Sequence, residues 1–100
     1  MVKHIVMWRL HDFADGMNKK ENTSRMKQWL EELKSAIPEI KNLEVGINFN
    51  NSDDAYDIVL YSEFKDKASL ERYQNHPEHV QFKEKIKNIR SEKKVVDYEI

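Results

Sequence analysis

Three observations predict an α+β fold in which an antiparallel sheet carries two helices on one face. Stretches with a period of two alternate along the 100-residue chain with stretches of helical periodicity. Their order is strand, helix, strand, strand, helix, strand. A short polar link joins the two central strands, and such a link is typical of an antiparallel hairpin.

The first half of the chain predicts a strand, a loop and a helix. Residues 2–10 alternate between two faces and are rich in β-branched and aromatic side chains, which predicts a strand covered at least partly on both faces. The polar residues 11–17 predict a loop. Asn18 and Glu21 have the spacing of a capping box, and Thr23 is a later candidate for the helix start. The apolar positions of this helix recur at helical spacing until Pro38 ends it: Met26, Trp29, Leu30, Leu33 and Ile37.

Two strands and a turn follow. Residues 43–49 alternate between apolar and polar side chains and predict the second strand. Residues 50–54, Asn-Asn-Ser-Asp-Asp, are typical of a turn. Residues 55–64 predict the third strand, antiparallel to the second.

A helix interrupted by proline precedes the last strand. Asp66 is the expected N-cap of a segment that carries Leu70 and Tyr73. Pro77 disfavours helical geometry at the residue before it, so the helix should break near Asn75 and start again with Pro77 in its first turn. An apolar stripe then continues to about residue 90, and residues 95–100 predict the fourth strand.

The resulting order, β-α-β-β-α-β, is that of the ferredoxin-like split arrangement, in a single domain of residues 1–100. Both faces of its sheet would carry large apolar side chains, with residues such as Ile5, Met7 and Val59 opposite the helices. Two helices cover only one face. We therefore expect a homodimer in which two sheets face each other and form an α/β barrel.

Composition excludes several classes of protein. Seventeen basic and 18 acidic residues give a net charge of −1, too little for general attraction to nucleic acid or an anionic membrane. The basic run from Lys83 to Lys94 is interrupted by acidic residues, and we expect it to be a solvated face. There are no cysteines, no apolar run reaches a membrane span, and the N-terminus lacks the pattern of a signal peptide. These features predict a cytoplasmic protein.

The segment Leu70 to Val80, LERYQNHPEHV, is the candidate for chemistry. The break at Pro77 should bring Tyr73 and His79 towards a common point from two pieces of backbone. An imidazole titrates near neutral pH and can take a proton from an acidic carbon. A phenol can donate a hydrogen bond to the enolate oxygen that forms.

Three of the four histidines also have a structural interpretation. In that interpretation Tyr73 packs under the sheet and His79 bonds a backbone carbonyl at the helix break. His4, in line with Val6 on a covered face, would be a satisfied core residue, while His76 would cap the second helical segment. We expect no metal site, because zinc needs three or four ligands and Pro77 separates the two nearest histidines.

Five motifs resemble the stress-responsive dimeric α/β-barrel (Dabb) family over essentially the whole chain. In chain order they are VKHIVMWRL, IPEIKNLEVGIN, YDIVLYSEF, YQNHPEHVQF and VVDYEI. The resemblance implies a ferredoxin-like fold and a homodimeric barrel. The family includes a plant polyketide cyclase that closes a resorcylic acid by aldol chemistry, and ring-forming stress proteins.

The resemblance also implies roles for individual residues. The catalytic tyrosine and histidine of the cyclase match Tyr73 and His79, and a pocket histidine of its first strand matches His4. This sequence has Asp57 where the cyclase has another histidine. The aromatic lining of the cyclase's first helix has no obvious counterpart, although Trp29 or Met26 could take its place.

These observations leave three functions open. The first is a cofactor-free enzyme on a small hydrophobic carbonyl compound, with His79 as base, Tyr73 as hydrogen-bond donor, and cyclase, isomerase or lyase chemistry. Its pocket would lie between sheet and helices, lined by His4, Val6, Trp8, Trp29, Leu30, Ile58 and Phe82. The second is a non-catalytic stress or assembly protein, with Trp8 and Trp29 filling that space. The third is a small-molecule binder without turnover.

Overall fold

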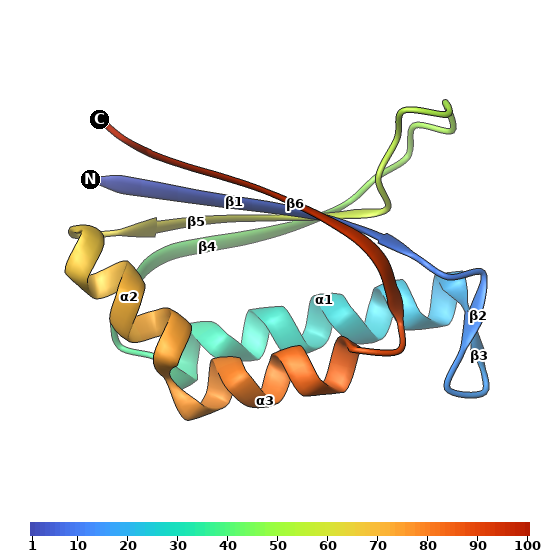
Figure 1. Ribbon diagram of the computed structural model, residues 1–100, viewed down its shortest axis with the longest axis horizontal. Coiled ribbons are helices and arrows are strands. Elements are labelled where there is room, and N and C mark those ends of the chain that lie inside the picture. The colour runs from blue at the N-terminus through green and yellow to red at the C-terminus, as the bar shows by residue number, and fades with distance from the viewer.

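The computed structural model describes all residues from 1 to 100 and contains a four-stranded antiparallel sheet with helices on one face. The sheet order is β4-β5-β1-β6, so β1 is central and β6 is an edge strand. Its strands are β1 (Val2–Leu10), β4 (Ile40–Ile47), β5 (Ile58–Phe64) and β6 (Arg90–Glu99). The helices are α1 (Lys19–Ala36), α2 (Lys67–Asn75) and α3 (Pro77–Ile86). Figure 1 shows all three helices below the sheet, which confirms the predicted ferredoxin-like fold.

The capping box predicted for α1 is present. The backbone N–H of Glu21 donates to the side chain of Asn18 at 2.8 Å, and the N–H of Asn18 donates to the Glu21 carboxylate at 3.1 Å. The helix ends at Ala36, two residues before Pro38. Its apolar face packs into the core through Met26, Leu30 and Leu33.

The predicted helix break at Pro77 is also present. The Asp66 side chain accepts from Ser69 N at 2.8 Å and starts α2. His76 is extended (ψ 137°), ends α2 and begins α3, with Pro77 in the first turn. The imidazole of His76 accepts from the N–H of Glu78 at 3.1 Å, so it caps α3 as predicted.

Several boundaries differ from the sequence-based expectation. The expected loop before α1 contains a short hairpin of β2 (Phe13–Ala14) and β3 (Met17–Asn18). Strand β4 starts at Ile40, before the predicted start at residue 43. An irregularity between Ile40 and Asn42 interrupts the side-chain alternation, so the sequence pattern does not show these first residues as part of the strand. Phe49 lies beyond the strand and is 95% exposed.

The starts of the third and fourth strands also differ from the predicted positions. Strand β5 starts at Ile58, since Ala55 N–H donates to Ser52 O at 3.0 Å within a turn. Strand β6 starts at Arg90, five residues before the predicted Val95. The charged residues 90–94 belong to this exposed edge strand because they pair with β1, in a register that runs from Leu10↔Arg90 to Val2↔Glu99.

The two faces of the sheet have different surroundings. The face towards the helices carries the core residues, which include Val6, Leu60 and Phe64. The other face carries apolar side chains at the paired positions Ile5↔Tyr61 and Ile5↔Val96, and no helix covers it. None of the helices combines the length and apolar character that crossing a membrane requires.

Candidate functional site

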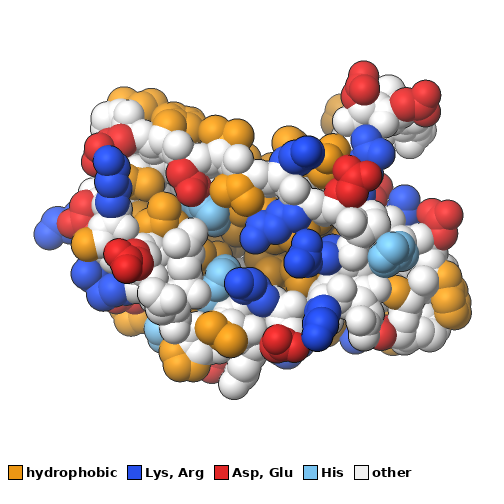
Figure 2. Space-filling model, in the orientation of Figure 1, with side chains coloured by type: hydrophobic (Ala, Val, Ile, Leu, Met, Phe, Trp, Pro, Cys, Tyr) orange, Lys and Arg blue, Asp and Glu red, His pale blue; other side chains and the backbone are white.

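A cavity of about 250 Å³ lies between the helix face of the sheet and the α2–α3 pair. Strands β1 and β6 provide one wall, and the ends of α2 and α3 provide the other. Figure 2 shows this face, with hydrophobic atoms at the floor of a hollow and histidine, lysine and arginine side chains around it. The floor and walls include His4, Val6, Trp8, Tyr73, His79 and Phe82.

Tyr73 and His79 meet at this cavity from two different helices. Tyr73 is in α2 and His79 in α3, and their ring centroids are 4.5 Å apart at an interplanar angle of 50°. The extended residue His76 turns the chain between them, so α3 does not continue the axis of α2. Tyr73 is only 1% exposed, whereas His79 is half-buried.

One hydrogen bond fixes the tautomer of His79. Its Nδ1 lies 3.0 Å from the backbone carbonyl oxygen of Gln74. A carbonyl oxygen only accepts, so Nδ1 carries the proton and donates it. In the neutral ring, Nε2 is then unprotonated and has a free lone pair.

The surroundings of His79 keep the ring neutral. Burial is the largest cause that lowers the pKa of His79, and the hydrogen bond to Gln74 O opposes it. With the positive charges of Lys83 and Lys93 and a smaller effect of His4, the pKa falls to about 4. At neutral pH the imidazole is therefore uncharged. It can accept a proton at Nε2.

Tyr73 has the opposite property. Burial raises the pKa of its phenol well above the ordinary value of 10.0. The hydroxyl therefore stays protonated at all physiological pH values and remains a hydrogen-bond donor. The site combines a neutral base with a neutral donor.

His4 extends this cluster into the sheet. Its Nδ1 pairs with the carboxylate of Asp97, the residue opposite it on β6. The ring of His4 is 5% exposed and lies 6.0 Å from the ring of Tyr73, centroid to centroid. The Asp97 carboxylate holds the imidazole in one orientation beside the phenol.

The structure separates the predicted pocket residues into two groups. His4, Val6, Trp8 and Phe82 line the cavity with Tyr73 and His79. Leu30 and Ile58 do not: they are 0% and 1% exposed within the core. Trp29 does not line the cavity: it packs partly buried against the core on α1, with its ring centre 4.7 Å from the guanidinium of Arg25 and 5.3 Å from the ammonium of Lys85 on α3. It therefore does not fill the cavity.

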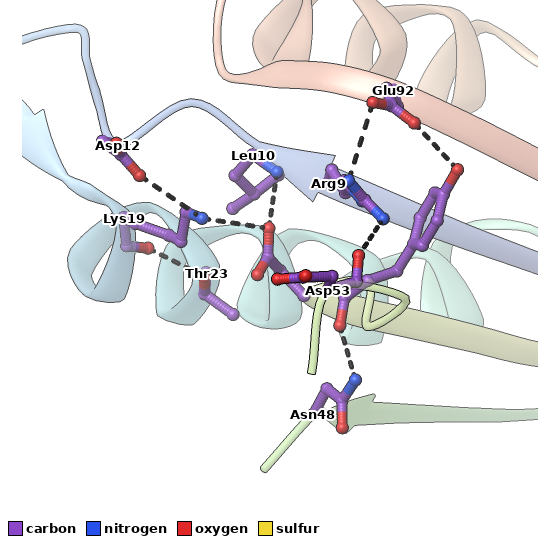
Figure 3. A network of polar contacts seen from close by, with 10 residues as sticks. Arg9, Leu10, Asp12, Lys19, Thr23, Asn48, Asp53 and Glu92 are labelled. Atoms are coloured by element: carbon purple, nitrogen blue, oxygen red, sulfur yellow. Dashed lines mark hydrogen bonds and ion pairs between the residues drawn. The ribbon is translucent and has the colours of Figure 1, made fainter. Parts of the chain in front are cut away.

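Asp57 does not line the cavity, although its backbone N–H donates to the carbonyl oxygen of Trp8 at 2.8 Å. Its carboxylate accepts from Leu10 N at 2.7 Å and lies 3.5 Å from the ammonium of Lys19. Figure 3 shows Leu10 and Lys19 in this polar network, together with Asp12 and Arg9. The network fixes the β1–α1 connection.

Sequence reasoning missed the polar residues around the pair of Tyr73 and His79, called the dyad below. Gln74 acts through its backbone, which no side-chain pattern reveals. Asp97 and Lys93 lie on the same face of β6, and Lys87, the C-cap of α3, follows Lys83 by four residues. This spacing was the available signal, but acidic residues interrupt the run from Lys83 to Lys94, and that mixed pattern alone predicts a solvated face.

The site offers no cluster of metal ligands. No three His, Asp or Glu side chains come close enough together to hold a metal ion. The nitrogens of His76 and His79 are turned to different partners, Glu78 N and Gln74 O. The arrangement can transfer a proton and stabilise a developing oxyanion with its own side chains.

Comparison with known proteins gives a family and a fold. The family model of the stress-responsive A/B barrel domain matches residues 2–100. A dimeric protein of unknown function and ferredoxin-like fold from Bacteroides fragilis is 34% identical with a TM-score of 0.85, covering 99% of this chain and 95% of that one. A dimeric ferredoxin-like protein of unknown function from Thermobifida fusca is 22% identical with a TM-score of 0.83, covering 99% and 90%.

A plant enzyme shares the same fold. The hydroxynitrile lyase of Passiflora edulis is 19% identical with a TM-score of 0.81, covering 99% of this chain and 92% of that one. Among curated proteins, none matches this sequence.

Proposed function

The chain belongs to the stress-responsive A/B barrel domain family, and we propose that it is a cofactor-free acid–base enzyme acting on a small hydrophobic carbonyl compound. His79 is the general base, and Tyr73 donates a hydrogen bond to the carbonyl oxygen. The reaction is an aldol-type cyclisation, an isomerisation or a lyase reaction, which share the same first step.

The observation that carries the proposal is that His79 and Tyr73 meet at the wall of an open cavity. The Nδ1–H···O hydrogen bond from His79 to Gln74 at 3.0 Å, which the structural interpretation also predicts, does not occupy the other ring nitrogen. It leaves the Nε2 lone pair free, next to a phenol that burial keeps protonated. A general base needs an unprotonated atom, and an oxyanion needs a donor that is not itself ionised. Both conditions meet at one cavity.

The proposed step is a proton abstraction next to a carbonyl group. The C–H bond breaks and its proton goes to Nε2 of His79, while the electron pair moves into the carbonyl group to form an enolate. The Tyr73 hydroxyl donates to the enolate oxygen, where negative charge develops. The protonated imidazole then returns the proton to carbon or to a leaving oxygen.

The open cavity favours this proposal over a purely structural role. A stress or assembly protein would have this space filled, with Trp8 and Trp29 as the expected plugs. Trp8 instead packs its ring edge-to-face with Phe82, at 6.1 Å between centroids, and forms part of the wall. Trp29 lies outside the cavity between Arg25 and Lys85. A small-molecule binder without turnover would use the same cavity.

Isotope exchange separates the enzyme from the binder. In D₂O, the protein should catalyse exchange of the methyl protons of 4-acetylbenzoate, followed by NMR. His79→Gln should slow this exchange about 10²–10⁴-fold, and Tyr73→Phe about 10²–10³-fold. The matched control is His11→Gln, an exposed histidine beyond β1, which should exchange at the wild-type rate. Exchange no faster than in buffer would contradict the enzyme proposal.

We also propose a homodimer formed through the open face of the sheet. Exposed apolar side chains gather there: Met7 is 37% exposed, Val96 54% and Tyr98 41%. Water contact with such a face is unfavourable, and a second copy would cover it through a two-fold axis. Similar structures from Bacteroides fragilis and Thermobifida fusca are dimeric.

A further inference from the structure

Four cationic side chains line one side of the cavity and have no partner. They are Lys83 and Lys87 next to the dyad, and Arg90 and Lys93 on the opposite wall. None of them forms an ion pair or donates a side-chain hydrogen bond within the protein, and what sets them apart is that all four line one cavity. The whole chain has a net charge of −1, so this is a local excess of positive charge.

The fold places these charges at the cavity. Lys93 pairs with Trp8 across the β1–β6 ladder and Arg90 pairs with Leu10, so both face the helices. Lys83 and Lys87 are four residues apart and share one side of the chain at the end of α3. Lys94, by contrast, pairs with Met7 and lies on the open face of the sheet.

The arrangement is unfavourable in the empty protein. Like charges four apart on a helix repel each other. Burial lowers the pKa of the Lys93 ammonium, and the charges of Lys83 and Arg90 lower it further, with Asp97 acting in the opposite direction. Glu84 is the one acidic residue that lines the cavity, and it pairs with none of the four, while the carboxylate of Asp97 is paired with His4. An anion bound here would relieve this repulsion.

The same cavity also has an apolar lining. Val6, Trp8, Phe82 and Val95 line the cavity together with the cations. An apolar cavity of about 150 Å³ holds a benzene ring, and this cavity has about 250 Å³. There is room for one ring or a short alkyl chain with a small polar head.

We propose that the substrate is an amphipathic carboxylate, with its apolar body on the Trp8–Phe82 floor and its carboxylate between Lys93 and the lysines of α3. This inference rests on the proposed function, because it uses the same cavity as the active site. It goes further in specifying that the substrate is negatively charged. The carboxylate is not the reacting group. It holds the molecule so that its carbonyl group reaches Tyr73 and His79.

Anion binding would also act on the base. Lys83 and Lys93 contribute to the low pKa of His79, together with burial and His4. A carboxylate beside these ammonium groups offsets their effect. The substrate would thereby make His79 a stronger base at the moment when the base is needed.

The test compares two probes of nearly equal shape, 4-acetylbenzoate and the neutral 4-acetylbenzamide, by calorimetric or NMR titration of the full chain. 4-Acetylbenzoate should bind at least about tenfold more tightly than 4-acetylbenzamide. Added salt should weaken the binding of the carboxylate and leave the binding of the amide unchanged. Acetate, which lacks the apolar body, should bind far more weakly than 4-acetylbenzoate. Equal binding of carboxylate and amide, or no binding of either, would overturn the proposal.

Charge-matched variants locate the site. The double variant Lys87→Gln/Lys93→Gln should bind 4-acetylbenzoate about tenfold more weakly than the wild type. Its affinity for the amide should be unchanged. Lys34→Gln/Lys41→Gln removes the same charge from exposed positions outside the cavity and should have no effect. An equal loss in both double variants would mean a general charge effect and would overturn the site. His79→Gln should keep the preference for the carboxylate, so a failure of catalysis can be told from a failure of anion recognition.

Discussion

The rings of His79 and Tyr73 lie 4.5 Å apart, centroid to centroid, although they belong to separate helices. The extended conformation of His76 makes this possible by turning the chain just before Pro77. On one continuous helix, residues six apart would point to different sides. The helix break therefore creates the pair.

Stability should depend on pH through His79. The pKa of His79 is about 4 in the folded protein, below its ordinary value of 6.5, so the unfolded chain binds the proton more readily between these values. Folding stability should be full above about pH 6.5 and should fall as the pH drops towards 4. Allowing for the partial exposure of the ring, we expect a loss on the order of 1–2 kcal/mol.

Urea unfolding between pH 4.5 and 7.5 measures this dependence. The difference between wild type and His79→Gln isolates the histidine, because all other titrating groups are common to both. As the pH falls, the free energy of unfolding should decrease much less in His79→Gln than in the wild type. Identical pH profiles for the two proteins would show that His79 titrates normally.

The N-cap of α2 should support the helix that carries Tyr73. Asp66→Ala removes the acceptor for Ser69 N–H, and loss of such a cap costs about 1 kcal/mol. Thermal unfolding of Asp66→Ala and of the control Asp54→Ala measures this effect. Asp54 is exposed and its side chain forms no hydrogen bond or ion pair, so its variant should unfold as the wild type does. Equal stability of all three proteins would rule out a capping role.

The open sheet face should control association. Val96→Lys places a charge among the apolar side chains of that face, opposite Ile5 on the neighbouring strand, and should convert the dimer to a monomer. Val80→Lys is the matched control, since Val80 is 48% exposed on α3, away from the sheet. Sedimentation at micromolar concentration measures both. A wild-type chain that sediments as a monomer would contradict the dimer proposal.

The extent to which sequence predicted this structure differs between backbone and site. Pro77 predicted the helix break because proline restricts its neighbour whatever the tertiary context. Residues 90–94 gave no strand signal, since these charged residues are extended only because β1 offers them an edge to pair with.

The same distinction applies to individual contacts. Tyr73 and His79 could be paired from the local break, which depends on a few residues of chain. The bond from His79 to Gln74 O involves a backbone atom and leaves no mark on residue type. The pairing of His4 with Asp97 joins residues 93 positions apart, and only the sheet register brings them together.

The most direct test of this account is the tautomer of His79, measured by long-range ¹H–¹⁵N correlation NMR at pH 7. We expect a neutral ring with the proton on Nδ1 and an unprotonated Nε2 whose signal shifts when 4-acetylbenzoate is added and differs in Tyr73→Phe. A ring protonated at Nε2, or one that responds to neither change, would contradict the assignment of His79 as the base beside Tyr73.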